Sequence, residues 1–231
     1  MNGHESAGVA AGGEASPAAS GIEATRLIAV RHGETAWNLE ARLQGQIDIP
    51  LNERGQAQAL RAAQSLAEDR PDVVVSSDLA RAQATAQVIA SFNECPLFLE
   101  PGLRERSFGS FEGFTHSEVA QRWPEASQRW RSRDPDFAPG DGESLRVFFD
   151  RCIAATLRVV EAHAGKTIVL VAHGGVLDCL YRAARRVDLD APRIWQLDNA
   201  AINRLLHTDS GLMLVGWNDT CHLDDPALDE L

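Results

Sequence analysis

The sequence lacks the features that mark a membrane protein or a nucleic-acid-binding protein. None of its apolar runs approaches the roughly 18 residues that a membrane span requires. It also lacks an excess of basic residues, since 22 lysines and arginines face 33 aspartates and glutamates, a formal net charge of -11. Because nucleic acids and anionic membranes are bound through Lys and Arg, we expect neither as a partner. A cationic site for an anionic substrate must therefore be local.

Patterns that hold metals or nucleotides are also missing. The four cysteines, at positions 95, 152, 179 and 221, have no CxxC spacing and are interpreted as small buried hydrophobic residues in a reducing compartment. The seven histidines form neither an HxH nor an HExxH pattern. There is no GxxxxGK loop, and no GxGxxG follows the first expected strand. We therefore expect neither metal-assisted hydrolysis nor a bound cofactor.

The two ends of the sequence differ in composition from the middle. The first two dozen residues are rich in Ala, Gly, Ser and Glu, with neither a basic start nor an apolar stretch, so they do not resemble a secretory signal. We expect a disordered tail at 1–24, one folded domain at 25–218, an acidic tail at 219–231 and a cytoplasmic location. The chain is long enough for this domain to bury a sizeable core.

The middle of the chain alternates short apolar runs with stretches of helical periodicity. Expected strands are 27–30, 73–75, 97–99, 168–172, 202–206 and 212–217, and expected helices are 53–69, 79–90, 143–164 and one from about 176. Asn52 and the cluster Ser76-Ser77-Asp78 are the expected helix caps. This order predicts a single α/β domain: a mostly parallel central sheet, helices on both faces and an antiparallel hairpin at one edge.

The segment 104–142 interrupts this alternation. It is rich in Phe, Trp, Arg and Pro and is predicted to contain only short helices. We interpret it as a lid or specificity segment over the site, with most of its aromatic residues in a core. Five arginines make it locally basic, at positions 104, 106, 129, 131 and 133, so an acidic phosphorylated substrate is compatible with it.

Two histidines stand at the ends of expected strands. His32 and His173 are each followed by glycine, which lets the backbone approach an anion closely. Arg31 precedes His32, and Arg81 lies in the first turn after another strand. Because ligands bind beyond the carboxyl ends of parallel strands, the fold is expected to bring these four side chains together.

These residue types suit phosphoryl transfer. A neutral imidazole can attack phosphorus, arginines can stabilise the transition-state charge, and a second histidine, if protonated, can donate another hydrogen bond. A carboxylic acid must protonate the leaving group. Glu105 is favoured for that role, with Glu34 and Glu112 as competitors. The alternatives are ordinary: a histidine that caps a strand, arginines in surface ion pairs, and a histidine packed in a glycine turn.

Five motifs resemble, in order, those of the histidine phosphatase superfamily, the phosphoglycerate-mutase-like group of branch 1. They are RHGETAWN at 31–38, QGQIDIPL at 44–51, SSDLARA at 76–82, LRERSFGSFEG at 103–113 and VAHGG at 171–175. The resemblance spans Thr25 to Trp217 and implies the phosphoglycerate-mutase-like fold. It implies that His32 is the nucleophile and Glu105 the proton donor. The implied phosphate and substrate ligands are Arg31, Asn38, Gln44, Gly45, Arg81, His173 and Gly174.

The acceptor of the phosphoryl group separates three hypotheses. Transfer to water makes the protein a phosphatase of small phosphorylated metabolites, transfer to a substrate hydroxyl makes it a mutase, and no transfer leaves a phospho-ligand binding module. The compact insertion and the pair Gly174-Gly175, where mutases of the family have Gly-Asn, favour the phosphatase. Asn38 as a helix cap and Gln44 as an ordinary loop residue are further alternatives. A homodimer is compatible with the sequence.

Overall fold

The computed structural model describes residues 24–224 and Met1, and its centre is a six-stranded sheet with strand order β3-β2-β4-β1-β5-β6. The first four strands in this order run parallel, and β5 and β6 are antiparallel to their neighbours. The strands are β1 (Thr25–Arg31), β2 (Val73–Ser76), β3 (Leu97–Leu99), β4 (Thr167–Ala172), β5 (Ile202–Thr208) and β6 (Gly211–Asp219). The predicted α/β domain and its edge hairpin are therefore confirmed.

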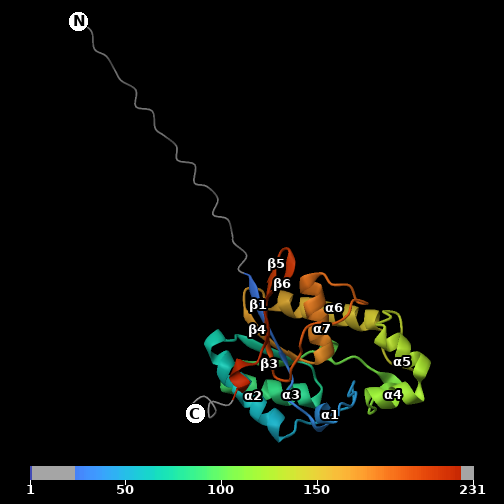
Figure 1. The fold of residues 1–231 in the computed structure, drawn as a ribbon. Helices are drawn as coiled ribbons and strands as arrows, with labels where there is room; N and C mark the ends of the chain where they lie inside the picture. Colours follow the sequence, from blue (N-terminus) through green and yellow to red (C-terminus); the bar gives the residue numbers. More distant parts are fainter. Residues whose placement is uncertain (2–23, 225–231) are drawn as a thin grey trace.

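The central strands β1 and β4 are apolar on both faces because helices cover both. Leu27 and Ala29 of β1 belong to one core cluster, whereas Ile28 and Val30 belong to the other. The first cluster includes residues of α6 (Leu145–Ala162) and α7 (Gly174–Arg185), and the second includes residues of α2 (Glu53–Leu66) and α3 (Ala80–Phe92). Figure 1 shows these pairs of helices on opposite sides of the sheet.

The helix starts test the predicted caps. The Asn52 side chain accepts a hydrogen bond from the Gly55 amide at the start of α2, as predicted. The predicted cap of the next helix is wrong, because Leu79 is the N-cap of α3 and makes no side-chain capping bond. Ser77 is instead buried, and its hydroxyl lies 2.9 Å from Nε2 of His173. Its oxygen also accepts a hydrogen bond from the Leu79 amide at 3.3 Å, so Ser77 makes both a local bond at the start of the helix and a contact with a distant part of the chain.

The interrupting segment contains only short elements, as predicted. They are the 3-10 turn Gly109–Phe111, α4 (His116–Arg122) and α5 (Pro124–Arg131). A small core of its own holds them together, built from Leu43, Phe111, Val119 and Phe137 with further aromatic rings packed around them. Figure 1 shows α4 and α5 at one end of the molecule, beside the sheet and away from β5 and β6. We refer to residues 104–142 as the lid segment.

Several expectations about the rest of the chain change. Cys152 and Cys179 are buried as predicted, but Cys95 is half-buried and Cys221 is exposed. The described structure continues past the expected domain end at residue 218, because β6 reaches Asp219 and a 3-10 turn covers Cys221–Leu223. Apart from Met1 and residue 24, the expected tail at 1–24 lies outside the described residues, as do residues 225–231.

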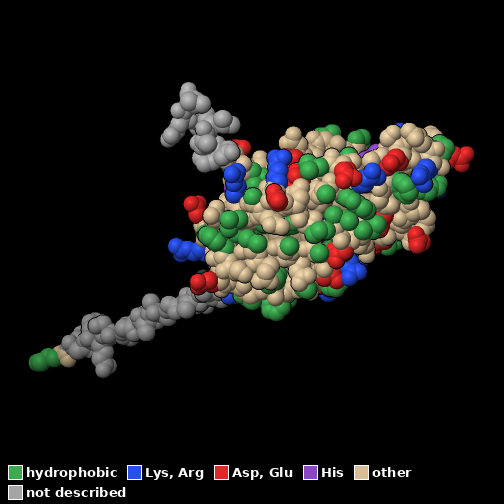
Figure 2. All heavy atoms as spheres, turned by 90° about the horizontal axis from the view of Figure 1, so that it is seen from below, with side chains coloured by type: hydrophobic (Ala, Val, Ile, Leu, Met, Phe, Trp, Pro, Cys, Tyr) green, Lys and Arg blue, Asp and Glu red, His purple; other side chains and the backbone are tan. Residues whose placement is uncertain are grey.

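The surface carries charged side chains of both signs (Figure 2). On the face seen in Figure 2, basic and acidic side chains are interspersed among apolar ones. Within residues 24–224, none of the helices combines the length and apolar character that crossing a membrane requires.

Candidate active site

The two central strands bring the two predicted histidines together. β1 and β4 are parallel neighbours whose last paired residues are Arg31 and Ala172, so His32 and His173 leave the sheet side by side. Their ring centroids lie 5.2 Å apart. Both side chains are buried, with exposed fractions of 3% and 0%. Parallel pairing in this register is therefore what converts two distant sequence motifs into one site.

The His32 ring is held in one tautomer. Its Nδ1 lies 2.7 Å from the carbonyl oxygen of Gly33, and because a carbonyl only accepts, Nδ1 carries the hydrogen. The other ring nitrogen, Nε2, is then left with a lone pair. Burial, followed by the charges of Arg81 and Arg31, holds the pKa of His32 well below its ordinary value of 6.5. The imidazole is thus neutral at pH 7, the form that attacks phosphorus.

Arg81 and Arg31 lie beside this ring without a carboxylate partner. Arg81 is 1% exposed, and its guanidinium donates to the backbone oxygens of Ile47 at 2.9 Å and Gly45 at 2.7 Å. Arg31 donates to the backbone oxygen of Leu197. No salt bridge within residues 24–224 includes either arginine, and the Nε atom of each is buried without a hydrogen-bond partner. Burial lowers the pKa of Arg31 to about 10. Two desolvated guanidiniums of this kind form a site for an anion.

The sequence left open whether His173 is protonated. Its Nε2 is bonded to the Ser77 hydroxyl, and its Nδ1 is buried without a partner among the described residues. Burial, then Arg81 and His32, hold its pKa well below 6.5. The protein by itself therefore favours a neutral His173, contrary to the protonated form considered from the sequence. A phosphate dianion placed between the arginines and the histidines would favour the charged form.

Glu105 is the carboxylate that faces this site. Its Oε1 accepts a hydrogen bond from the Arg106 amide at 2.8 Å, and its Oε2 accepts one from the Gly175 amide at 3.0 Å. Gly175 belongs to the first turn of α7, so the helix end predicted to bind an anion already binds this carboxylate. Of the three candidate acids only Glu105 lines the pocket; Glu34 and Glu112 do not.

The remaining predicted ligands lie at the same place but differ in what fixes them. The Asn38 side-chain oxygen accepts from the Thr35 amide at 3.0 Å and completes the capping box of α1 (Ala36–Leu39), whose N-cap is Thr35; Asn38 also lines the pocket. Gln44 is 8% exposed, and its Oε1 is buried without a partner among the described residues. Gly45 contributes the carbonyl that holds Arg81 and has φ +53°, a conformation that favours glycine.

The two glycines that follow the histidines have different roles. A Cβ at Gly33 would lie 2.3 Å from the backbone oxygen of Gly55 in α2. Gly33 is therefore required for packing against α2, a role that the sequence did not indicate. A Cβ at Gly174 would meet Nε of Arg31 at an ordinary 3.6 Å. Gly174 lines the pocket next to Arg31, as expected.

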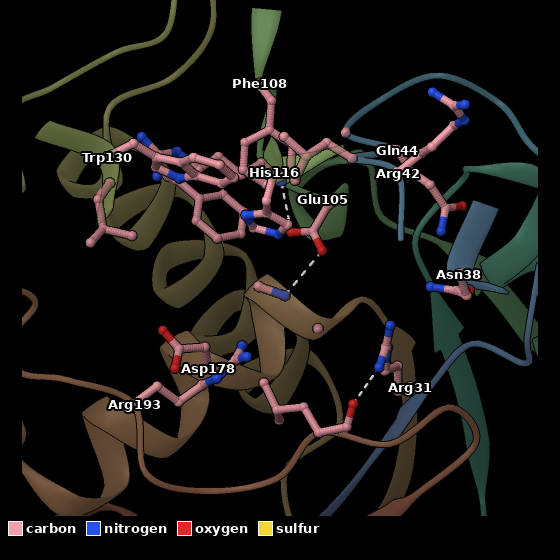
Figure 3. Close-up of a pocket in the computed structure, with 18 of the residues that line it drawn as sticks. Arg31, Asn38, Arg42, Gln44, Glu105, Phe108, His116, Trp130, Asp178 and Arg193 are labelled. Carbon is pink, nitrogen blue, oxygen red and sulfur yellow. Dashed lines mark hydrogen bonds between the residues drawn. The ribbon is translucent and has the colours of Figure 1, made fainter. Parts of the chain in front are cut away.

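One side of a pocket of about 580 Å³ is lined by Arg31, Asn38, Gln44, Gly45, Arg81, Glu105, Gly174 and Gly175, whereas the buried His32 and His173 are not part of its lining. The pocket continues to the lid segment and to the loop between α7 and β5. Figure 3 shows Asn38 and Gln44 on one side of it and Asp178 and Arg193 on the other, with Glu105 between. Five further residues line the pocket without having been predicted from the sequence: Arg42, Asp178, Arg193, Trp195 and Leu197. None of them lies in one of the five motifs, and the only local signal was the charge of the first three.

Comparisons with known proteins agree with this geometry. The model of the histidine phosphatase superfamily (branch 1) matches residues 27–220. Two relatives from Arabidopsis thaliana are a phosphoglycerate mutase-like protein, 38% identical over 88% of this chain and 89% of its own length, and a metal-independent phosphoserine phosphatase, 40% identical over 87% and 84%. The crystal structure of a phosphoserine phosphatase from Entamoeba histolytica, in complex with 3-phosphoglyceric acid, superposes with a TM-score of 0.78 at 30% identity. It covers 87% of this chain and 100% of its own.

Proposed function

This chain belongs to branch 1 of the histidine phosphatase superfamily, and we propose that it is a phosphatase that hydrolyses small phosphomonoesters through a phosphohistidine at His32. The observation that carries the proposal is a buried, neutral imidazole beside two guanidiniums that have no carboxylate partner among the described residues. Only an anionic substrate with a transferable group gives this combination a use.

The first step forms the phosphohistidine. The lone pair on Nε2 of His32 attacks phosphorus, and the bond between phosphorus and the leaving oxygen breaks. Glu105, as the acid, gives its proton to that oxygen and becomes a carboxylate. The amides of Arg106 and Gly175 hold this carboxylate in place, at 2.8 and 3.0 Å. The alcohol then departs with the proton.

The second step returns the enzyme to its starting state. Water attacks phosphorus opposite Nε2, and Glu105 takes the proton that the water loses. The bond between phosphorus and Nε2 breaks, its electron pair returns to the imidazole, and inorganic phosphate leaves. In both steps Arg31, Arg81 and His173 surround the equatorial oxygens, where the charge of the transition state lies.

The proposal is tested with an aryl phosphate assay in the presence of EDTA. We expect turnover by the full chain and its loss in His32→Ala, because Nε2 of His32 is the atom that accepts the phosphoryl group in the first step. His163→Ala is the matched control, since His163 lies at the end of α6 outside the pocket lining. Acid-labile phosphate on the wild-type chain, absent from His32→Ala, would identify the intermediate. An inactive wild type contradicts the proposal, and activity abolished by EDTA contradicts its metal-free form.

A mutase is the second candidate, because one of the relatives is a phosphoglycerate mutase-like protein and the pocket exceeds the size of a phosphate group. Transfer from His32 to a hydroxyl of a bound product would then replace transfer to water. Incubation with 3-phosphoglycerate separates the two: released phosphate supports the phosphatase, and the 2-isomer without released phosphate supports the mutase.

A further inference from the structure

The pocket carries more positive charge than a phosphate needs. Six arginines and three carboxylates line it, a formal excess of three positive charges in a chain whose net charge is -11. The arginines are Arg31, Arg42, Arg81, Arg106, Arg133 and Arg193. A phosphomonoester brings about two negative charges near neutral pH. The excess is still three when Arg42, which pairs with Glu40, and Glu105, which is protonated when substrate binds in the proposed mechanism, are both set aside, because five arginines and two aspartates remain. About one positive charge is therefore left for another part of the substrate.

Most of these arginines already have partners. Arg31 and Arg81 surround the phosphate position, and Arg42 pairs with Glu40 at 2.7 Å. Arg106 donates to two backbone oxygens at 2.9 Å. Arg133 pairs with Asp178 at 3.0 Å. Arg193 is the exception, because no hydrogen bond or ion pair joins it to any residue in the described part of the chain.

Asp178 does not neutralise Arg193, although Figure 3 shows the two on the same side of the pocket. One oxygen of Asp178, Oδ2, already accepts from Arg133 at 3.0 Å and from the buried Arg182 at 2.9 Å. The other oxygen is buried and has no partner among residues 24–224. One carboxylate thus serves two arginines, and Arg193 is left as a third cation beside them.

The surroundings of Arg193 are cationic. Its charge contributes to lowering the pKa values of Arg31 and Arg133, for both of which burial is the larger cause. It has the same effect on His116, whose ring stacks on Trp130 at a centroid distance of 4.8 Å. A cation placed among like charges and aimed into a pocket is stabilised when an anion binds there.

We propose that Arg193 binds a carboxylate on the organic part of the substrate, so that the enzyme selects phosphomonoesters that carry a carboxylate over those that do not. This inference rests on the proposed function. A carboxylate brings one negative charge, which matches the single positive charge that remains in the pocket after the phosphate has bound, whereas a second phosphate brings about two. Arg193 presents a planar fork that matches the two carboxylate oxygens.

The test compares substrates that differ only in the carboxylate. O-Phosphoserine is paired with phosphoethanolamine, and 3-phosphoglycerate with glycerol 3-phosphate. For the wild type we expect the member with the carboxylate to have the higher kcat/KM in at least one pair. In Arg193→Gln, the kcat/KM for the member with the carboxylate divided by that for the member without it should fall about tenfold, which is the effect expected of a charge-assisted hydrogen bond at a partly solvated site. Arg185→Gln, which removes an exposed arginine outside the pocket lining, should leave the ratio unchanged.

A binding measurement separates this inference from the proposed function. In the His32→Ala background, calorimetric affinities for 3-phosphoglycerate and glycerol 3-phosphate report the carboxylate without any turnover. The inference is overturned if Arg193→Gln leaves both the kinetic and the binding ratios unchanged. It is also overturned if fructose 1,6-bisphosphate gains more from Arg193 than 3-phosphoglycerate does, which would make the second group a phosphate. An inactive wild type that still binds 3-phosphoglycerate through Arg193 overturns the phosphatase alone.

Discussion

The two sides of the pocket are built in different ways. The phosphate side lies at the ends of β1 and β4, and its histidines and Arg81 are almost entirely buried. The lid side consists of the lid segment and the loop that carries Arg193, where the side chains that line the pocket are half-buried or exposed except for the buried Arg106 and Leu197. In the mechanism proposed above, the two sides therefore have different roles. The sheet edge fixes the groups that act on phosphorus in every substrate, and the loops present the groups that distinguish one substrate from another.

The largest effect is expected at Arg81. In Arg81→Ala the guanidinium beside phosphorus is lost, and the backbone oxygens of Gly45 and Ile47 lose their donor. We expect kcat/KM to fall about 10³-fold for every phosphomonoester, with or without a carboxylate, because one transition-state donor is worth roughly that much. Steady-state kinetics on the substrate pairs above measure it.

Arg42→Ala is the control for Arg81, because its arginine also lines the pocket but pairs with the exposed Glu40. Circular dichroism should show that both variants are folded. If kcat/KM in Arg81→Ala fell only for substrates with a carboxylate, Arg81 would bind the carboxylate, and the two sides of the pocket would not have the separate roles described above.

Glu105 stands between the two sides and should show an effect that depends on the leaving group. In Glu105→Gln the side chain cannot supply a proton, so we expect hydrolysis of alkyl phosphates to fall about 10²-fold or more. A dinitrophenyl phosphate, whose leaving group needs no proton, should lose far less. A plot of kcat/KM against leaving-group pKa measures this. An equal loss for all leaving groups would show that Glu105 binds substrate and does not protonate it.

The sequence predicted the phosphate side far better than the lid side, and the reason is physical. An apolar run such as Leu27 to Val30 marks a doubly covered strand, and parallel strands end at one edge, so His32 and His173 could be placed from local signals. The Arg193 loop has no such signal. Its backbone oxygens at Leu189 and Ala191 are held by Arg133 and Arg182, contacts that exist only in the folded chain.

The same reason explains why two contacts at the phosphate side were not predicted. The positions of Ser77 and Gly33 follow from contacts with His173 and with Gly55 of α2. Neither partner is near in sequence, so the local pattern was read as a helix cap in one case and as an anion-binding glycine in the other. Charge states also depend on the assembled site, because burial and Arg81 together lower the pKa of His173.

A smaller effect should follow from loosening the segment that carries Glu105. Arg151 of α6 donates to the backbone oxygens of Gly102 at 2.9 Å, Arg104 at 3.0 Å and Glu105 at 3.3 Å. It also pairs with Glu143 at 2.7 Å. In Arg151→Met we expect about a tenfold loss on alkyl phosphates, because a misplaced acid transfers its proton less well.

The leaving-group plot distinguishes positioning from general damage in this variant. If Arg151 positions Glu105, the loss of kcat/KM in Arg151→Met should grow with leaving-group pKa as it does in Glu105→Gln, but by a smaller amount. The kcat/KM should recover in part in Arg151→Lys. A uniform loss across leaving groups, or no recovery by lysine, would assign Arg151 a purely structural role.

The smallest effect is expected on stability, and it compares the histidines of the two sides. Burial keeps the folded-state pKa of His32 and His173 well below 6.5, so only the unfolded chain takes up their protons just below that pH. The free energy of unfolding should therefore decrease as the pH is lowered below about 6.5, by about 1 kcal/mol per pH unit for each such histidine. For His116, which is exposed, partial burial and the charge of Arg193 lower the pKa in the same direction. Urea unfolding at several pH values between 7.5 and 5.5 measures how the free energy of unfolding depends on pH. Relative to the wild type, this dependence should be clearly weaker in His173→Gln and only slightly weaker in His116→Gln. The same dependence in the wild type and both variants would show that burial does not distinguish the histidines of the two sides.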